Sequence, residues 1–362
     1  MIAWPRFQRF ASRFFLTRPI VRSEASALFD LTAGFVYSQI LDACVELDLF
    51  NRLSNGPAEL ATLAAEANLP EPEMERLLLA AEALRLVGHR SKGRWGLGQL
   101  GAAVNGTPGL AEMIRHHRLL YQDMRDPTAL LRSQGREAAL HRYWTYAQDG
   151  NSARLSAEQV TEYSALMAAS QRMLSDDILD AIRIERIDNL LDVGGGEGAF
   201  VIRAAERSRR TRLGLYDLPP VAALAAERAK AAGQADRITT IGGDFKDGGL
   251  PEGFDTVSLI RVLYDHDDDT VRALLSQIRA ILPENGTLII AEPMDGDGGE
   301  ARVGAAYFGF YLLAMRGGRA RKPERLQELL SETGFGAIEI KRTAKPMLVR
   351  VVTARAIKQH NP

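Results

Sequence analysis

Residues 190–200 read Leu-Leu-Asp-Val-Gly-Gly-Gly-Glu-Gly-Ala-Phe, and this stretch decides the fold of the chain. The apolar residues before the glycines predict a buried strand, and a helix is expected over 199–208. Glycine adopts positive φ at little cost and lets backbone N–H groups come close to a ligand. The order of strand, glycine-rich turn and helix therefore predicts a nucleotide-binding unit, whose turn contains Gly194, Gly195, Gly196 and Gly198.

The glycine pattern alone fits two kinds of cofactor. Gly194, Gly196 and Ala199 match the Gly-x-Gly-x-x-Gly/Ala pattern of dinucleotide-binding proteins, and the same glycines match the Gly-x-Gly-x-Gly turn of S-adenosylmethionine enzymes. The next predicted strand, 212–216, ends at Asp217. This position is about 20 residues after the turn, where a carboxylate accepts hydrogen bonds from ribose hydroxyls. We therefore expect a cofactor that contains adenosine.

Later strand ends carry further polar and aromatic residues. A strand over 238–241 leads into Gly242-Gly243-Asp244-Phe245, and a strand that begins at Phe254 leads into Tyr264-Asp265-His266. An acid and an aromatic ring at 244 and 245 are suited to an adenine amino group and its ring face. This order of motifs resembles the class I S-adenosylmethionine-dependent methyltransferases, specifically the plant and bacterial small-molecule O-methyltransferase family.

The resemblance implies S-adenosylmethionine as the cofactor. It would place Gly194 and Gly196 beside the amino-acid part of the cofactor, Asp217 on the ribose, and Asp244 and Phe245 on the adenine. No metal is implied.

The spacing of apolar segments predicts the architecture of this α/β part. Strands are expected at 188–193, 212–216, 237–241, 254–260, 287–292, 337–342 and 347–353, with helices at the first five crossings and a short turn before the last strand. Alternating strands and helices predict a doubly wound parallel sheet, and the closing hairpin predicts an antiparallel last strand. Such a seven-stranded, Rossmann-like sheet resembles the class I methyltransferases rather than the NAD-binding proteins.

The first half of the chain is predicted to be mostly helical. Two helices over 57–66 and 74–85, followed by a β-like segment over 87–97, outline a winged helix. The second helix carries glutamates where a DNA-recognition helix presents cations and amides, so no nucleic-acid partner is expected. In the resembled family such a module mediates dimerisation, which implies a homodimer. The expected domains are a basic amphipathic segment (1–23), a winged-helix-like dimerisation and substrate-lid domain (24–157) and a cofactor-binding domain (158–362).

Composition excludes few functions. The 362 residues are 46% hydrophobic and 25% charged, with a formal net charge of −1, so there is no global field for anionic partners. The single cysteine, Cys44, excludes an intrachain disulfide, and we expect a reducing compartment, the cytoplasm.

Residues 1–23 contain five arginines, five aromatic residues and no acid. This segment can dock on a partner subunit, lie at a lipid surface as a peripheral contact, or serve as an organelle presequence. The apolar run over 305–315 is shorter than the ~20 residues of a spanning helix, and no membrane crossing is expected.

The predicted catalytic loop departs from the resembled family. The family places a histidine directly after the fourth strand, in a His-Asp-Trp motif, as the general base. This chain has Tyr264-Asp265-His266 there, and Ala320 at the position of the glutamate that orients the base. Three alternatives are open: His266 is the base, Tyr264 is a hydrogen-bond donor or a relay through Asp265, or the chain binds the cofactor without methylating.

A narrower resemblance suggests the acceptor. The segments 28–39, 261–267 and 306–315 look like the hydroxyneurosporene/demethylspheroidene O-methyltransferases of purple phototrophic bacteria. This implies a long polyene whose tertiary hydroxyl is methylated in carotenoid biosynthesis. Candidates for a substrate pocket or for ordinary packing are the aromatic residues at 307, 308, 310 and 311 and the connector residues His116, His117, Tyr121, Tyr143, Trp144 and Tyr146. Alternatives are a phenolic, hydroxyindole or polyketide O-methyltransferase, and a non-catalytic cofactor-binding or winged-helix regulator.

Overall fold

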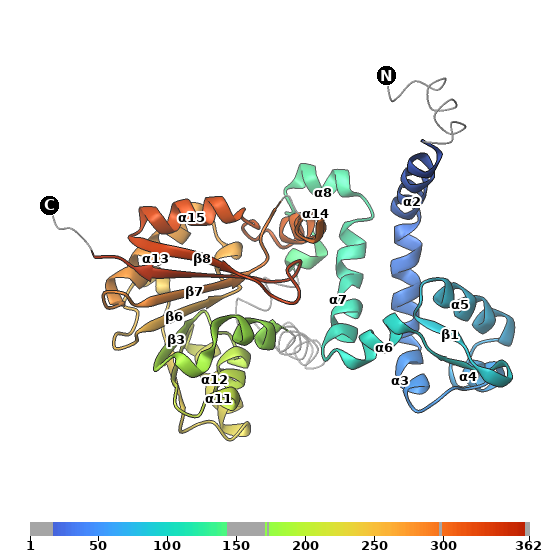
Figure 1. Ribbon diagram of the computed structural model, residues 1–362, viewed down its shortest axis with the longest axis horizontal. Helices are drawn as coiled ribbons and strands as arrows, with labels where there is room; N and C mark the ends of the chain where they lie inside the picture. The colour runs from blue at the N-terminus through green and yellow to red at the C-terminus, as the bar shows by residue number, and fades with distance from the viewer. Residues whose placement is uncertain (1–16, 143–170, 172–173, 297–298, 359–362) are drawn as a thin grey trace. The chain divides into compact units, whose positions relative to one another are not determined.

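The computed structural model describes residues 17–142, 171, 174–296 and 299–358. The chain divides into two compact units, residues 1–107 and residues 108–362 (Figure 1). The expected boundary between 157 and 158 lies outside the described residues. So do residues 1–16 of the basic segment and most of the helix expected over 158–184, of which residues 174–182 are described and are helical.

The first unit is a helical module with a small two-stranded sheet. The helix pair and the hairpin of the predicted winged helix are both present. Helix α2 begins at Arg18, so it crosses the expected boundary after residue 23. The elements are α2 (Arg18–Glu46), α3 (Leu49–Ser54), α4 (Leu60–Glu66), α5 (Glu71–Ala83), β1 (Val87–His89), β2 (Trp95–Leu97) and α6 (Gln99–Gly106).

Helix α2 carries large apolar side chains that are exposed in the described residues. Leu31 and Phe35 are 81% and 72% exposed, and Leu28, Phe29 and Val36 are exposed as well. Helix α2 is long and apolar enough to cross a membrane, judged by length and composition alone. Core helices of soluble proteins and signal sequences pass the same test. An apolar face of this size is typical of a surface that another molecule covers.

The second unit contains a seven-stranded sheet in the order β5-β4-β3-β6-β7-β9-β8. Strands β3 to β7 are parallel, and β9 is antiparallel to both β7 and β8. This topology confirms the predicted Rossmann-like class I methyltransferase sheet with its reversed last strand. The strands are β3 (Asn189–Val193), β4 (Arg212–Asp217), β5 (Ile238–Gly242), β6 (Thr256–Ile260), β7 (Thr287–Glu292), β8 (Phe335–Lys341) and β9 (Arg350–Ala356).

The prediction for the last strand was wrong in position. It expected residues 347–353 after a short turn, but β9 begins at Arg350, and residues 342–349 connect it to β8. The apolar residues that suggested a strand are buried for another reason. Leu348 packs against the cluster that contains Tyr264, and Val349 is fully buried in the core of the unit.

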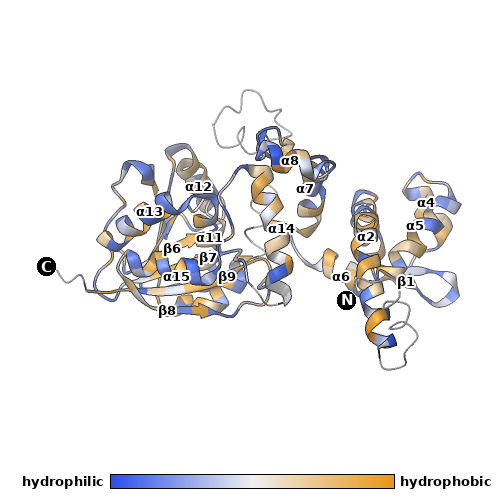
Figure 2. Cartoon of the chain, turned by 90° about the horizontal axis from the view of Figure 1, so that it is seen from above, coloured by the Kyte–Doolittle hydropathy of each residue, from blue (hydrophilic) through white to orange (hydrophobic). Residues whose placement is uncertain are grey.

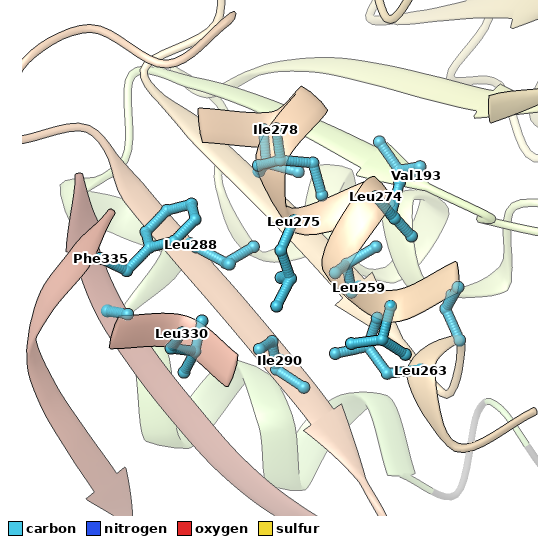
Figure 3. Packing of buried hydrophobic residues seen from close by; sticks show 14 of the residues in the cluster. Val193, Leu259, Leu263, Leu274, Leu275, Ile278, Leu288, Ile290, Leu330 and Phe335 are labelled. Atoms are coloured by element: carbon cyan, nitrogen blue, oxygen red, sulfur yellow. The ribbon is translucent and has the colours of Figure 1, made fainter. Parts of the chain in front are cut away.

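Helices cover both faces of the sheet because successive strand residues alternate between the faces. Leu190 packs with α11 (Ala199–Arg207) and α12 (Pro219–Ala231), whereas its neighbour Leu191 packs with α13 (Asp268–Ile281) and α15 (Pro323–Glu332). Figure 3 shows the second face, where Leu259 and Ile290 meet Leu275. The two apolar layers hold the strand ends in fixed positions.

Three further helices form a separate layer of the second unit. Helices α7 (Leu110–Asp123) and α8 (Pro127–Ser133) pack on α14 (Gly299–Met315), which follows β7. Apolar residues occur along most of α14 (Figure 2). The sequence analysis assigned residues 108–142 to the first domain. They cluster with the second unit because α7 and α8 bury their apolar residues against α14.

Candidate active site

The carboxyl ends of the parallel strands bring the predicted site residues to one edge of the sheet. The glycine turn follows β3, Asp217 ends β4, Asp244 follows β5, and the segment 261–266 follows β6. In open α/β sheets this edge is where ligands bind. The residues of the candidate site therefore come from the carboxyl ends of β3, β4, β5 and β6.

The turn after β3 requires glycine at several positions. Gly194 and Gly196 have φ of 70° and 57°, a region that side chains disfavour. At Gly195 a Cβ would lie 2.8 Å from Asp192 Oδ2 and 2.8 Å from Leu215 Cγ. Glycine therefore lets the turn lie close against Asp192 and β4, and this compact turn is a cradle suited to a nucleoside cofactor.

Two carboxyl groups flank this turn. Asp217 Oδ2 accepts the Gly196 N–H at 2.8 Å, and burial raises the pKa of Asp217, an effect that the N–H groups of Gly196 and Leu218 partly offset. Asp192 is fully buried and accepts a hydrogen bond from Ser258 Oγ at 2.6 Å, while its Oδ2 has no partner among the described residues. Burial raises the pKa of Asp192 to about 7. The sequence analysis assigned no role to Asp192.

Asp244 and Phe245 begin the short helix η4 (Phe245–Asp247). Asp244 Oδ1 accepts the Lys246 N–H at 2.8 Å. The Phe245 and His266 rings are in edge contact, with centroids 5.4 Å apart and an interplanar angle of 77°. Burial, and then the charge of Lys246, lowers the pKa of His266. His266 is therefore a neutral, half-buried ring beside the residue expected to contact adenine.

Tyr264 lies in a different environment from His266. Its side chain is buried against Phe308 and Leu312 of α14, and its hydroxyl oxygen accepts a hydrogen bond from Arg261 Nη2 at 3.1 Å. The guanidinium carbon of Arg261 lies 5.6 Å from the centroid of the tyrosine ring. Burial raises the pKa of Tyr264 above its ordinary value, so the phenol keeps its proton at neutral pH.

Two acids lie at the loop that carries Tyr264, a fully buried one at the end of β7 and a half-buried one within the loop. Glu292, at the end of β7, accepts the Tyr264 backbone N–H at 3.0 Å through Oε2. Glu292 Oε1 and Asp265 Oδ1 have no hydrogen-bond partner within the described part of the chain. Burial raises the pKa of Asp265 to about 7 and that of Glu292 to about 8. Both groups therefore hold protons for part of the time near neutral pH.

The stretch 318–321 packs against the other side of the same loop. Arg321, whose side chain is 1% exposed, donates to the backbone oxygens of Leu263 and His266 and pairs with Asp268 at 2.8 Å. A Cβ at Gly318 would lie 2.5 Å from the backbone oxygens of Tyr264 and His266. Ala320 packs against the cluster that contains Tyr264.

The sequence analysis missed Arg261, Glu292 and Arg321 as site residues. Each is a charged residue that lies at the end of an apolar strand or in a glycine-rich connection. Arg261 is only three residues from Tyr264, the residue that it binds. For Glu292 and Arg321 that position was the only signal available, because their partners are distant in sequence. Glu292 is 28 residues from Tyr264, and Arg321 is 58 residues from Leu263.

Helices α7 and α14 are joined by two histidine–tyrosine hydrogen bonds. His116 Nε2 lies 3.0 Å from the Tyr311 hydroxyl, and His117 Nε2 lies 2.6 Å from the Tyr307 hydroxyl. The sequence analysis named these histidines as candidates for the pocket. Other aromatic candidates, Tyr143, Trp144 and Tyr146, lie outside the described residues.

Comparison with known families identifies both units. An O-methyltransferase domain matches residues 128–336, and an O-methyltransferase dimerisation domain matches residues 29–107. The dimerisation domain supports a homodimer.

Two curated relatives cover nearly the whole chain. The demethylspheroidene O-methyltransferase of Cereibacter sphaeroides is 41% identical over 96% of this chain and 92% of its own length. The protein of the same name from Rhodobacter capsulatus is 38% identical over 96% of this chain and 86% of its own length.

Solved structures share the fold. An S-adenosylmethionine-dependent methyltransferase, SibL, has a TM-score of 0.79 at 22% identity and covers 92% of this chain and 99% of its own. Human N-acetylserotonin methyltransferase in complex with S-adenosylmethionine has a TM-score of 0.72 at 23% identity, covering 92% and 98%. From its sequence, sheet and glycine cradle, the chain belongs to the S-adenosylmethionine-dependent O-methyltransferase family.

Proposed function

We propose that this chain transfers the methyl group of S-adenosylmethionine to the tertiary hydroxyl of a hydroxycarotenoid of the hydroxyneurosporene or demethylspheroidene type. The observation that carries the proposal is the pair of demethylspheroidene O-methyltransferases at 41% and 38% identity over 96% of the chain. Relatives named for aromatic acceptors, such as a naphthoate and a phenazine O-methyltransferase, are 28% and 25% identical.

In this proposal the cofactor lies along the carboxyl ends of β3 to β5. Gly194 and Gly196 lie beside its amino-acid part, Asp217 binds the ribose, and Asp244 and Phe245 bind the adenine. The positive φ angles of the glycines and the 2.8 Å contact between Gly196 N and Asp217 Oδ2 support this assignment. The bound cofactor supplies a methyl group on a positively charged sulfur.

The acceptor hydroxyl is proposed to meet the loop 264–266. Tyr264 would orient the acceptor oxygen, since its phenol keeps its proton and its oxygen is fixed by Arg261. Asp265, which carries an oxygen without a partner among the described residues, would be the neighbouring polar group of that site. The hypothesis that His266 is the base remains a prediction, and its ring contact with Phe245 favours a position at the adenosine end.

The function is tested with purified chain, methyl-labelled S-adenosylmethionine and detergent-dispersed 1-hydroxyneurosporene. Catechol and a hydroxyindole serve as parallel acceptors. Label in the organic phase with the carotenoid supports the proposal. Label on the aromatic acceptors alone would overturn the carotenoid assignment, and cofactor binding without transfer to any acceptor would point to a non-methylating relative.

Peripheral membrane contact belongs to the same proposal. The basic aromatic residues 1–23 and the exposed apolar side chains of α2 would bring the enzyme to the lipid phase in which a carotenoid dissolves. Flotation with phosphatidylglycerol vesicles should recover the chain at low salt, and less of it at high salt. Flotation with phosphatidylcholine alone is the control. A chain that stays with the soluble fraction in every case would contradict this contact.

A further inference from the structure

Methyl transfer to an alcohol needs a group that takes the hydroxyl proton. Tyr264 is poorly suited to this task, because burial raises its pKa and its oxygen already accepts a hydrogen bond from Arg261. His266, the other candidate in this loop, contacts Phe245 at the proposed adenosine end. Helix α14, which packs against Tyr264, carries a tyrosine that is hydrogen-bonded to an imidazole able to take this proton.

Tyr307 of α14 lies next to the Tyr264 cluster. It packs against the group formed by Tyr264, Phe308 and Leu312, and also against the apolar layer between α7 and α14. The charge of Arg261, the residue that holds the Tyr264 hydroxyl, also acts on Tyr307. Tyr307 is thus the tyrosine that links the loop after β6 with helix α7.

The hydroxyl of Tyr307 is 2.6 Å from His117 Nε2, which is a short hydrogen bond. The rings meet edge to face, with centroids 5.5 Å apart. Tyr307 and His117 are both half-buried. A phenol in contact with an imidazole can receive the proton of the acceptor while its own proton passes to the ring nitrogen.

We propose that Tyr307 and His117 form the proton relay that removes the acceptor's hydroxyl proton, in place of the histidine that the resembled family has at position 264. This inference rests on the proposed function. As the acceptor oxygen attacks, the bond between oxygen and the methyl carbon forms and the bond between that carbon and sulfur breaks. The acceptor proton moves to Tyr307 Oη while the proton of Tyr307 moves to His117 Nε2, which leaves S-adenosylhomocysteine and an imidazolium.

The surroundings of the pair agree with a relay through a neutral phenol. Burial, and then neighbouring Tyr311, raises the pKa of Tyr307, so a lasting phenolate is disfavoured and a concerted transfer is required. Among the described residues, the groups that act on the pair include Arg261, which follows β6, Tyr311 on α14, and His116 and Tyr121 on α7.

The adjacent pair, His116 and Tyr311, offers a matched control one turn along α14. It has the same chemistry, but His116 and Tyr311 are both buried. Burial, and then the charge of His117, lowers the pKa of His116 to about 4, which makes His116 a poor proton acceptor at neutral pH. If the hydrogen bonds serve only to join α7 to α14, the two pairs should behave alike.

The test compares Tyr307→Phe, His117→Gln and the control Tyr311→Phe with wild type. Single-turnover transfer of labelled methyl to detergent-dispersed 1-hydroxyneurosporene is measured from pH 5 to pH 9, along with the Kd for S-adenosylmethionine. Removal of a general base costs about 10² to 10⁴ in rate, and we expect this loss for Tyr307→Phe and for His117→Gln. The Kd should not change. The wild-type rate should fall at low pH as His117 becomes protonated, and His117→Gln should lose this dependence.

The outcomes separate the two proposals. Equal rates for Tyr307→Phe and Tyr311→Phe, or a low-pH fall that persists in His117→Gln, would overturn the relay and leave the proposed function intact. A wild-type chain that transfers no label to the carotenoid would overturn the proposed function and the relay together. An unchanged Kd in the slow variants would show that they fold and bind the cofactor. Their loss of rate is then due to the missing proton transfer.

Discussion

The cofactor side and the acceptor side of the site are built in different ways. The cofactor side depends on backbone: glycines with positive φ after β3 and a carboxylate, Asp217, that accepts a glycine N–H. The acceptor side depends on buried side chains that hold one loop, among them Arg261, Glu292 and Arg321. A glycine turn that binds the cofactor through its backbone is compatible with many acceptors. The buried side chains that hold the acceptor loop suit one kind of acceptor. The difference explains how a chain keeps its cofactor residues while position 264 changes.

The largest expected effect tests whether buried charge holds the acceptor loop. Arg321→Met removes donors from the backbone oxygens of Leu263 and His266 and from Asp268. Loss of a buried charged partner of this kind costs about 3–5 kcal/mol of unfolding free energy. The control is Arg319→Met, because Arg319 binds the same Asp268 at 2.9 Å but is 65% exposed. Its loss should cost at most about 1 kcal/mol in chemical denaturation. Equal losses would contradict a specific role for the buried arginine.

The burial of Glu292 beside the same loop is tested by the pH dependence of the stability of the chain. Its pKa rises from 4.5 to about 8 on folding, so the folded chain holds a proton that the unfolded chain has released. Between these two values stability falls as the pH rises, and above pH 8 the full cost remains. Glu292→Gln removes this cost, of which about 3.5 kcal/mol develops between pH 5 and pH 8, and should flatten the decline of Tm over that range. The exposed Glu284→Gln is the control, and parallel curves for wild type and Glu292→Gln would refute the burial argument.

The backbone cradle is tested with a single methyl group. In Gly195→Ala the new Cβ would lie 2.8 Å from Asp192 Oδ2 and from Leu215 Cγ. Overpacking of this kind costs about 1–3 kcal/mol, so the affinity for S-adenosylmethionine should fall about tenfold to hundredfold by calorimetry. Gly309→Ala is the control, since a Cβ there has no neighbour within 4 Å among the described residues. If both variants bind the cofactor equally well, the turn does not form the cradle.

The smallest effects separate the two ends of the loop 264–266. Tyr264→Phe removes one hydroxyl that accepts from Arg261 and should lower kcat by about tenfold, with little change in KM for S-adenosylmethionine. His266→Ala removes the ring contact with Phe245, worth about 0.5–1.5 kcal/mol, and should raise that KM by roughly twofold to tenfold. Steady-state kinetics with varied cofactor distinguish these changes. A drop in kcat alone for His266→Ala would restore His266 as the candidate base.

The sequence predicted those parts of the site that depend on local rules. Glycine at 194 and 196 and a carboxylate at the end of the next strand follow from backbone needs that leave a pattern in the chain. It could not predict the partners of Tyr264, because the loop is held by residues from other strands and connections. The contact between His117 and Tyr307 joins residues 190 positions apart, which no local pattern encodes. The start of β9 was wrong for the same reason, since burial of Leu348 and Val349 by distant elements imitates a strand.

The position of β9 has a consequence for the order in which the enzyme matures. Strand β7 carries Glu292, and its outer neighbour is β9, with Glu292 opposite Arg350. A ribosome produces residues 350–356 after all the other strands of the sheet. The acid that holds the acceptor loop therefore gains its second neighbouring strand only after the other strands of the sheet have been made. A nascent chain can assemble β3 to β6, the cofactor half, before the acceptor half is complete.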